Sequence, residues 1–222
     1  MLKLIQTYYP MLFGALGETL RLTFTSLCFA LVIGLVFGLM NVGKKRVFNF
    51  IGTIYVDAVR GVPLIVLAFW IYFGLPSGIQ AMGVQGFRLS AIQAGTIALA
   101  MNCGAYMAEI MRAGIDSVDK GQMEASRSLG LSYVKGMRLV VLPQAIRTMI
   151  PSIINQFIIT LKDTSILSVI GYAELTSVGR TMGANSLQIM ESWTIVAIVY
   201  MVVIVTLSKI SKRIERRVNR GR

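Results

Sequence analysis

The feature that most limits how this chain can fold is a series of long stretches without a charged side chain. About 20 mostly apolar residues, at roughly 1.5 Å per residue, cross the hydrocarbon core of a bilayer as a helix. The apolar residues here do not alternate with polar ones, as they would in the shorter strands of a membrane barrel. The charge-free stretches are 22–43, 61–87, 89–108 and 192–208, and a further pair, 148–161 and 164–173, is split only by Lys162-Asp163.

These stretches, with a mean hydropathy of +0.69, predict an all-α polytopic membrane protein with about five spanning helices. We find no internal repeat, so residues 1–222 are expected to form a single membrane domain. Residues 1–17 are expected to lie along the outer interface. Because no small-residue cleavage site follows an early apolar run, the first span is expected to act as its own insertion signal. The predicted spans are 19–40, 61–76, 89–111, 148–170 and 192–209, with a polar insert at 112–147.

The net charge of +12 is distributed unevenly along the chain. Most of the 22 Lys and Arg residues follow the first span, lie in the insert or close the chain, whereas the segments 77–91 and 174–191 hold only Arg88 and Arg180. Cationic loops stay in the cytoplasm. The pattern therefore predicts an N-terminus outside and a C-terminus in the cytoplasm, and it disfavours a basic nucleic-acid-binding face, which would not follow the alternation of loops.

The polar insert 112–147 is too long for a simple turn, and connections of this length usually have a function. A short helix is predicted from Glu124 to Leu129, ended by Gly130. A second is predicted from about Ser132 to Leu142, ended by Pro143. Two short helices at right angles to the spans would form a rigid knob for a cytosolic partner. A solvated loop with incidental glycines is the alternative that the residues leave open.

The insert also contains a recognisable motif. Glu124-Ala125-Ser126, Gly130 after three more residues, and Val140-x-Leu142-Pro143 after nine more resemble the EAA signature of importer permeases of the ABC (ATP-binding cassette) transporters. Ser126 stands in place of the second alanine and Val140 in place of isoleucine. The blocks 60–76, 105–125 and 142–166 are similar to those of the polar amino acid uptake branch.

This resemblance implies a type I importer fold and an inner-membrane permease subunit of a bacterial plasma membrane. It implies a second permease chain, identical or related, two ABC ATPase subunits, an extracytoplasmic solute-binding protein and an amino acid substrate. In such families the EAA helix docks into a cleft of the ATPase. Carried over by position, the residues implied to couple to the ATPase are Glu124, Ala125, Ser126, Gly130, Leu142 and Pro143.

Charged residues inside a predicted span are costly and point to function. Lys162 and Asp163 are neighbours in the fourth span, and neighbours on a helix project about 100° apart, so each needs its own partner. Lys162 is a candidate to hold the carboxylate of a free amino acid and Asp163 its ammonium group, with hydroxyls from Thr164 and Ser165. The alternative is a structural ion-pair network with Glu109, Arg60 or a second subunit.

The third span carries a polar stripe. Asn102, Tyr106 and Glu109 recur at intervals of four and three residues, so they share one helical face. We expect this face to line the translocation path, with Asn102 contacting substrate and Glu109 acting as a gate or as an ion-pair partner of Arg112. Polar contacts between helices are the alternative use of such a stripe.

Two further spacings predict packing. Asp57 and Arg60, three residues apart, are expected to pair on one helical face. Gly34 and Gly38 form a GxxxG pattern in the first span, which is typical of closely packed helices.

The chain lacks a phosphate-binding loop of the form GxxxxGK[ST], and no catalytic or metal-ligand spacing is found, so ATP and Mg²⁺ are expected in a partner ATPase. The sequence thus predicts a permease for a polar or basic amino acid that is not itself an enzyme. Three alternatives remain: an ABC permease for methionine, phosphonate or peptide, a self-contained secondary carrier, and a membrane scaffold or sensor. A carrier would usually have more spans and inverted repeats.

Overall fold

The computed structural model describes residues 1–43 and 45–219; Lys44 and residues 220–222, including Arg220 and Arg222 of the predicted cytoplasmic tail, lie outside the described residues. Within the described ranges the secondary structure is helical and contains no strand, as predicted. The helices are α1 (Leu2–Val42), α2 (Arg46–Arg60), α3 (Leu64–Phe69), α4 (Leu75–Ala81), α5 (Ala91–Asp116), α6 (Lys120–Ser128), α7 (Tyr133–Gly136), α8 (Leu142–Asp163), α9 (Leu175–Ser186) and α10 (Ile189–Asn219), with π-helical segments η1 (Trp70–Gly74) and η2 (Met137–Val141) and a 3-10 segment η3 (Thr164–Ile170).

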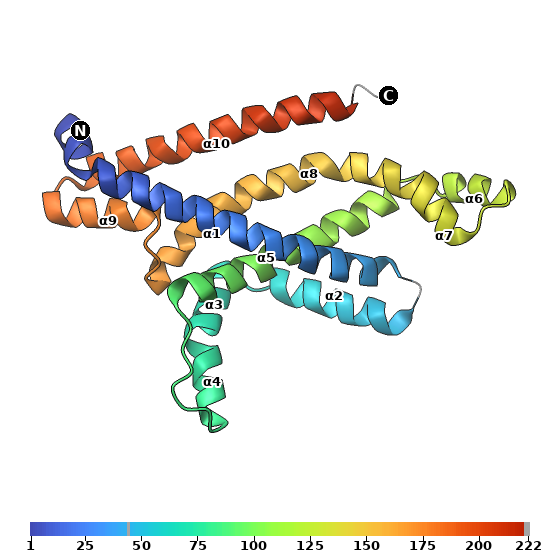
Figure 1. Ribbon diagram of the computed structural model, residues 1–222, viewed down its shortest axis with the longest axis horizontal. Helices are drawn as coiled ribbons and strands as arrows, with labels where there is room; N and C mark the ends of the chain where they lie inside the picture. The colour runs from blue at the N-terminus through green and yellow to red at the C-terminus, as the bar shows by residue number, and fades with distance from the viewer. Residues whose placement is uncertain (44, 220–222) are drawn as a thin grey trace.

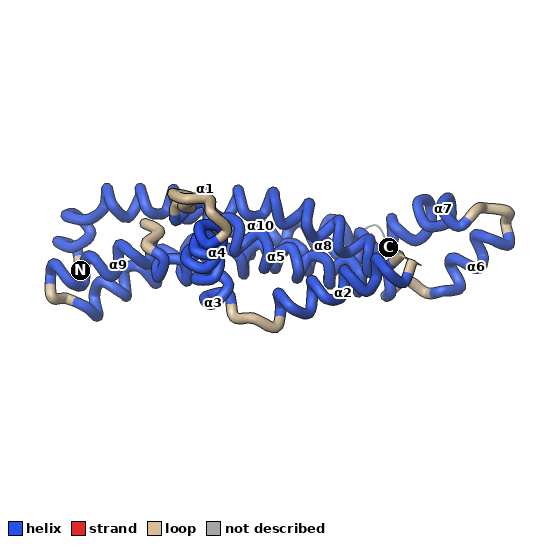
Figure 2. Tube along the Cα trace, turned by 90° about the horizontal axis from the view of Figure 1, so that it is seen from below, coloured by secondary structure: helices blue, strands red, loops and turns tan. Residues whose placement is uncertain are grey.

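The molecule is elongated because its long helices run close to one direction. Figure 1 shows α1, α5, α8 and α10 along the long axis. The N-terminal end of α1 lies at one end of the molecule, and α10 runs from there towards the other (Figure 1). The segments α6 and α7 extend beyond the bundle at one end, and α9 lies at the other. The view in Figure 2 shows that the bundle is thin in the third dimension.

The packing of α1 on α5 depends on glycines, as the GxxxG pattern predicts. A Cβ on Gly34 would overlap Cβ of Met107, and a Cβ on Gly38 would lie 3.1 Å from Cβ of Met111. On the facing helix, Gly104 leaves room for Ile33. The missing side chains therefore let the two backbones approach closely.

Four helical stretches in the described part of the chain are long and apolar enough to cross a membrane: Leu2–Val42, Leu64–Ala81, Tyr133–Ile170 and Ile189–Arg216. The fifth predicted span, 89–111, corresponds to α5, which has 26 residues but is less apolar than the others. A helix surrounded by protein needs no apolar lipid-facing surface, and α5 has eleven buried residues, among them Ala98, Cys103 and Met107.

The N-terminal segment differs from its prediction. Residues 1–17, expected to form a separate interfacial segment, belong to α1, which continues for 41 residues from Leu2 with Pro10 inside it. Proline removes one helical hydrogen bond and bends a helix without always ending it. The first turns of α1 lie at an angle to the rest of the helix in Figure 1.

Two further helix ends were predicted wrongly, and the reason is the same in both. Pro76, the last residue of the predicted span 61–76, and Pro143 were expected to end helices, yet the chain stays helical through each of them. The ring of a proline collides with the carbonyl four residues earlier. Here that carbonyl lies inside a π-helical segment, where the N–H of Leu75 bonds the oxygen of Trp70 and the N–H of Leu142 bonds that of Met137, five residues back. The widened turn accommodates each proline.

The run of α3, η1 and α4 forms an arm that projects from the side of the bundle, nearly across its long axis (Figures 1 and 2). Its base is anchored in a buried cluster that includes Leu64, Ala68 and Ile71. Further out, Trp70 is 76% exposed and Met82 is 85% exposed. The arm therefore presents a large apolar surface that this chain does not cover.

Buried polar bonds fix the end of the bundle that carries α9. The carboxylate of Glu174, which has no exposed surface, caps α9 by accepting hydrogen bonds from the N–H groups of Thr176 and Ser177 at 2.8 and 2.9 Å. The hydroxyl of Tyr200 on α10 donates to the same carboxylate at 2.9 Å. On the other side, Tyr172 donates to Glu18 of α1 at 2.7 Å. One short segment thus connects α1, α9 and α10.

Candidate functional site

A cavity of about 500 Å³ lies where α5 and α8 meet the turn between α2 and α3. Asn102 and Tyr106 of the predicted stripe line it from α5, and Asp163 lines it from the last turn of α8. The predicted shared face of Asn102 and Tyr106 is therefore turned towards an open space. The other lining residues are Arg60, Gly61, Val62, Pro63, Leu64, Gln156 and Ile159.

A second cavity, of about 450 Å³, adjoins the first on the side towards α6 and α7. It contains Glu109, the third member of the stripe, together with Ser152 and Asn155 of α8. The residues that line both cavities are Arg60, Tyr106 and Gln156. These three side chains consequently form the boundary between the two spaces.

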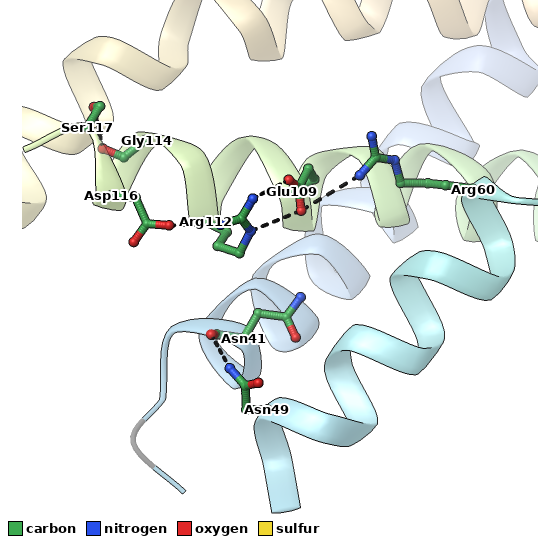
Figure 3. A network of polar contacts seen from close by, with 8 residues as sticks. All are labelled: Asn41, Asn49, Arg60, Glu109, Arg112, Gly114, Asp116 and Ser117. Carbon is green, nitrogen blue, oxygen red and sulfur yellow. Dashed lines mark hydrogen bonds and ion pairs between the residues drawn. The ribbon is translucent and has the colours of Figure 1, made fainter. Parts of the chain in front are cut away.

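An ion cluster lies beside this boundary (Figure 3). Glu109 accepts hydrogen bonds from Arg112 at 2.5 and 3.1 Å, and Arg112 also donates to Asp116 at 2.9 Å. From the other side, Nη1 of Arg60 lies 3.7 Å from Glu109. The expected contact between Glu109 and Arg112 is therefore present, and Glu109 joins the end of α2 to α5.

Arg60 does not make the pair predicted for it. Its guanidinium lies over the ring of Tyr106, 5.1 Å from the ring centre, in addition to its contact with Glu109. No ion pair between Arg60 and Asp57 is present among the described residues. Arg60 is the last residue of α2, where the chain turns away at Gly61, so its side chain reaches α5 more readily than the preceding turn.

The four residues predicted at the end of the fourth span separate into two groups. Asp163 lines the first cavity, whereas Lys162 is exposed and lies outside the lining of both cavities. Thr164 is fully buried, and its hydroxyl donates to the carbonyl of Leu161 at 2.7 Å. Ser165 donates to the carbonyl of Lys162. In this conformation only Asp163 is brought to Asn102 and Tyr106.

The alternative of a structural ion-pair network also finds no contact here. Within residues 1–43 and 45–219, neither Lys162 nor Asp163 lies within ion-pair distance of Glu109 or Arg60. The divergence of the two neighbouring side chains follows from the 100° step of the helix.

Sequence reasoning missed Arg60 and Gln156 as members of the site. Gln156 was available from periodicity, because Ser152, Gln156 and Asp163 are separated by four and seven residues and share one face of α8. No periodicity in the sequence indicated Arg60, because only the fold brings the end of α2 close to α5.

The helical hairpin of α6 and α7 contains the predicted coupling motif. Gly130 has φ +83°, and around it Gly130 N–H bonds the carbonyl of Arg127 while Leu131 N–H bonds that of Ser126. The predicted end of the first helix at Gly130 is thus present, and its backbone is left-handed there. Because side chains other than glycine disfavour such a φ, Gly130 fixes the turn of the hairpin.

Contacts within the hairpin make it rigid. Ser126 is buried, and a Cβ on Gly136 would collide with its hydroxyl. The amide of Gln144 on α8 donates to Gln122 on α6 at 3.2 Å. Glu124 and Ala125 lie on the exposed side of α6, and Leu129 is 83% exposed at its end. The outer face of the hairpin is thus exposed, while its inner face is packed.

The last two residues of the motif, Leu142 and Pro143, lie outside the hairpin. They follow η2 at the start of α8, with Leu142 partly buried and Pro143 exposed, so they form the base of the hairpin rather than its tip. The second predicted short helix therefore continues directly into the fourth span.

Comparison with known proteins gives consistent results. Residues 30–220 match the family described as binding-protein-dependent transport system inner membrane component. The glutamine transport system permease protein GlnP of Escherichia coli (strain K12) is 38% identical over 208 residues, covering 94% of this chain and 93% of the relative. The arginine transport system permease protein ArtQ of Bacillus subtilis (strain 168) is 34% identical over 208 residues, covering 94% and 92%.

Solved structures share the fold. A chain in the crystal structure of an amino acid ABC transporter with histidines is 38% identical, with a TM-score of 0.89 and 96% of both chains covered. A chain of the inward-facing MetNI methionine ABC transporter is 22% identical, with a TM-score of 0.77 over 96% of this chain and 98% of its own, a likeness of fold alone.

Proposed function

The chain belongs to the family of binding-protein-dependent transport system inner membrane components, and from this premise we propose that it forms the membrane path of an importer for a polar amino acid. The observation that carries the proposal is the first cavity, which has a cation, Arg60, an anion, Asp163, and two amide side chains, Asn102 and Gln156. A free amino acid presents a carboxylate, an ammonium group and a side chain, and these four residues match that set.

The balance of charge in the cavity favours a neutral polar substrate over a basic one. Arg60, whose contact with Glu109 at 3.7 Å is longer than the bonds from Arg112 to that acid, would bind the carboxylate, and Asp163 would bind the ammonium group. The amides of Asn102 and Gln156 are then left for a side chain that forms hydrogen bonds. A basic side chain would need a second acid. The nearest acid in the adjoining cavity, Glu109, is already bonded to Arg112. Relatives whose names include glutamine and arginine represent both classes.

Three of the residues predicted to bind substrate would not contact it in this conformation: Lys162, Thr164 and Ser165. The hydroxyls of Thr164 and Ser165 bond the backbone that carries Asp163, so they hold the end of α8 in place. Lys162 faces away from the cavity and would bind substrate only after a rotation of α8 or from a second chain.

Energy would come from two ABC ATPase subunits, which would bind ATP and Mg²⁺. These subunits would contact the hairpin at the exposed residues Glu124, Ala125 and Leu129. The N-terminus would lie outside and the C-terminus in the cytoplasm of a bacterial plasma membrane, with α5 as a fifth span. A solute-binding protein would deliver substrate to the outer face. The exposed arm of α3 and α4 would pack against a second permease chain, identical or related, because its apolar surface is otherwise uncovered.

Two neighbouring residues provide a matched test. We expect D163N to abolish uptake of the amino acid by the importer reconstituted with its ATPase and binding protein, while K162Q retains most of it. Amino acids are screened for stimulation of ATP hydrolysis and for uptake. If no amino acid changes turnover, the substrate class is wrong; equal losses in the two variants would place the site elsewhere.

The hairpin is tested separately by disulfide trapping. A cysteine at Ala125 should link to a cysteine in the ATPase cleft, whereas one at Ser77 on the arm should not. This contact separates the proposal from its alternatives, since a self-contained carrier or a membrane scaffold would link at neither position. A methionine or peptide importer would link at Ala125 but would fail the amino acid screen.

A further inference from the structure

Cations at the start of α2 and the end of α10, on the side of the bundle nearest α6 and α7, lie beside exposed apolar side chains (Figure 1). We propose that this end of the chain binds the phosphate headgroups of anionic phospholipids at two places, the start of α2 and the end of α10. The proposal goes beyond transport, and its ligand is a phosphodiester with acyl chains in the inner leaflet.

The first place is an open cavity of about 630 Å³ along the start of α2. Arg46, Asn49 and Thr53 line it with polar groups, while Val47 and Phe50 line it with apolar ones. The amide of Asn49 donates to the carbonyl of Asn41 at 2.6 Å, which holds the start of α2 against the end of α1 (Figure 3). The cavity therefore lies where α2 is hydrogen-bonded to the end of α1.

Exposed apolar side chains continue this arrangement along α2. Val47 is 70% exposed and Phe50 is 66% exposed, whereas Val56 and Val59 on the opposite side are buried. The ammonium group of Lys45 lies 5.7 Å from the ring centre of Phe48. A cation at the helix start with exposed aromatic and aliphatic side chains after it suits a headgroup and its acyl chain.

The second place is the end of α10. Lys209, Lys212, Arg213 and Arg216 are separated by three, one and three residues, so they form one stripe along the helix. All four are exposed, and within the described part of the chain none lies within ion-pair distance of an acid, including Glu215 on the same turns. Ile210 and Ile214 are 48% and 42% exposed between them.

The position of the two cationic sites along the molecule favours lipid over a protein partner. In both Figure 1 and Figure 2, α6 and α7 extend further along the long axis than the start of α2 and the end of α10. The two sites thus lie on the flanks of the bundle, where its helices would leave the bilayer, and not on the tip that a cytosolic subunit would meet first. Basic residues just beyond a span attract anionic lipids, at about 1 kcal/mol for each cation.

The test uses the full-length chain in a neutral detergent, with native mass spectrometry to titrate phosphatidylglycerol and phosphatidylcholine of the same acyl length. We expect tighter binding of phosphatidylglycerol, and a loss of about five-fold for each cation removed in K45Q/R46Q and in K209Q/K212Q/R213Q/R216Q. The matched control is R88Q, which removes a cation from the loop at the far end of the arm. Gel filtration verifies that each variant is folded.

Three outcomes would overturn the proposal. The first is equal affinity of the wild-type chain for the two lipids. The second is unchanged lipid binding in both multiple variants. The third is displacement of phosphatidylglycerol by millimolar inorganic phosphate, which would identify a site for a free anion. The second outcome, together with loss of a copurifying ATPase subunit from the variants, would assign the cations to a protein contact. None of these measurements depends on amino acid uptake.

Discussion

The two ends of the fourth span are built differently. At one end, η3 and α9 are fixed by a buried carboxylate, Glu174, with bonds to α9 and α10. At the other end, the hairpin of α6 and α7 has internal contacts at Ser126 and Gly136 but reaches the bundle mainly through the continuous helix of η2 and α8. One end is locked to its neighbours, whereas the other is a compact hairpin that is joined to the bundle by residues 117–119 after α5 and by η2, which continues into α8.

This difference indicates which parts can move together. We expect a force applied to the hairpin to act along α8, because α7, η2 and α8 form one helical run from Tyr133 to Asp163. The same run carries Gln156 and Asp163 into the cavities. Displacement of the hairpin against a fixed far end would therefore alter the lining of the cavities without unfolding either end.

The largest effect is expected at the locked end. E174A removes the acceptor of two backbone N–H groups and of the Tyr200 hydroxyl, so we expect a loss of about 3 kcal/mol in the free energy of unfolding. Thermal unfolding of the purified chain in detergent measures it. D57A removes an exposed acid of α2 and should change stability little. Equal effects of E174A and D57A would show that the far end is not locked by this carboxylate.

The hairpin end should respond in the opposite way. G136L places a side chain against Ser126 and Met123, at a cost of about 2 kcal/mol that separates α6 from α7. Because the hairpin lies outside the bundle, we expect the unfolding temperature of the bundle to stay near wild type, while substrate-stimulated ATP hydrolysis in the reconstituted importer falls at least ten-fold. G14L introduces the same side chain into open space on α1. A large fall in unfolding temperature for G136L would contradict the separation of the two ends.

The helical architecture and the coupling hairpin could be predicted from sequence because both depend on local signals. Apolar stretches of spanning length gave the long helices, and Gly130 gave the end of α6. The effects of Pro76 and Pro143 were misjudged because relief of a proline clash by a preceding π turn depends on backbone geometry that composition does not encode.

Part of the site could also be predicted from sequence, because that part depends on local periodicity. Asn102 and Tyr106 share a helical face, which periodicity reveals, and they line one cavity with Asp163. Arg60 comes from a different helix, and its contact with Glu109 exists only after α2 folds back along α1 and α5. The spacing of three residues instead predicted an ion pair between Arg60 and Asp57. Contacts between elements distant in sequence are decided by packing.

A pH titration tests the buried carboxyl group of Glu174 at the locked end. Burial raises the pKa of the Glu174 carboxyl above its ordinary value, although bonds from Thr176, Ser177 and Tyr200 partly offset this. The folded chain then holds this proton more tightly than the unfolded chain, so the stabilisation is complete below the unfolded pKa and is lost as pH rises through the folded one. We expect the unfolding temperature of wild type to fall relative to that of E174Q as pH rises above the ordinary pKa of a glutamate. A difference that grows in the opposite direction would exclude the raised pKa.

The smallest effect is expected at Gly130, and it examines the hairpin alone. Its φ of +83° costs an alanine about 1 kcal/mol, so G130A should weaken the turn that closes α6 without removing any contact. Hydrogen exchange should show about five-fold less protection of the Leu131 N–H, which bonds the carbonyl of Ser126, and no change in the amides of α9. The control G17A adds the same methyl group to α1, where nothing lies within 4 Å. Equal loss of protection in α6 and α9 would mean that the two ends of the fourth span open together, and the hairpin would then not move as an independent rigid body.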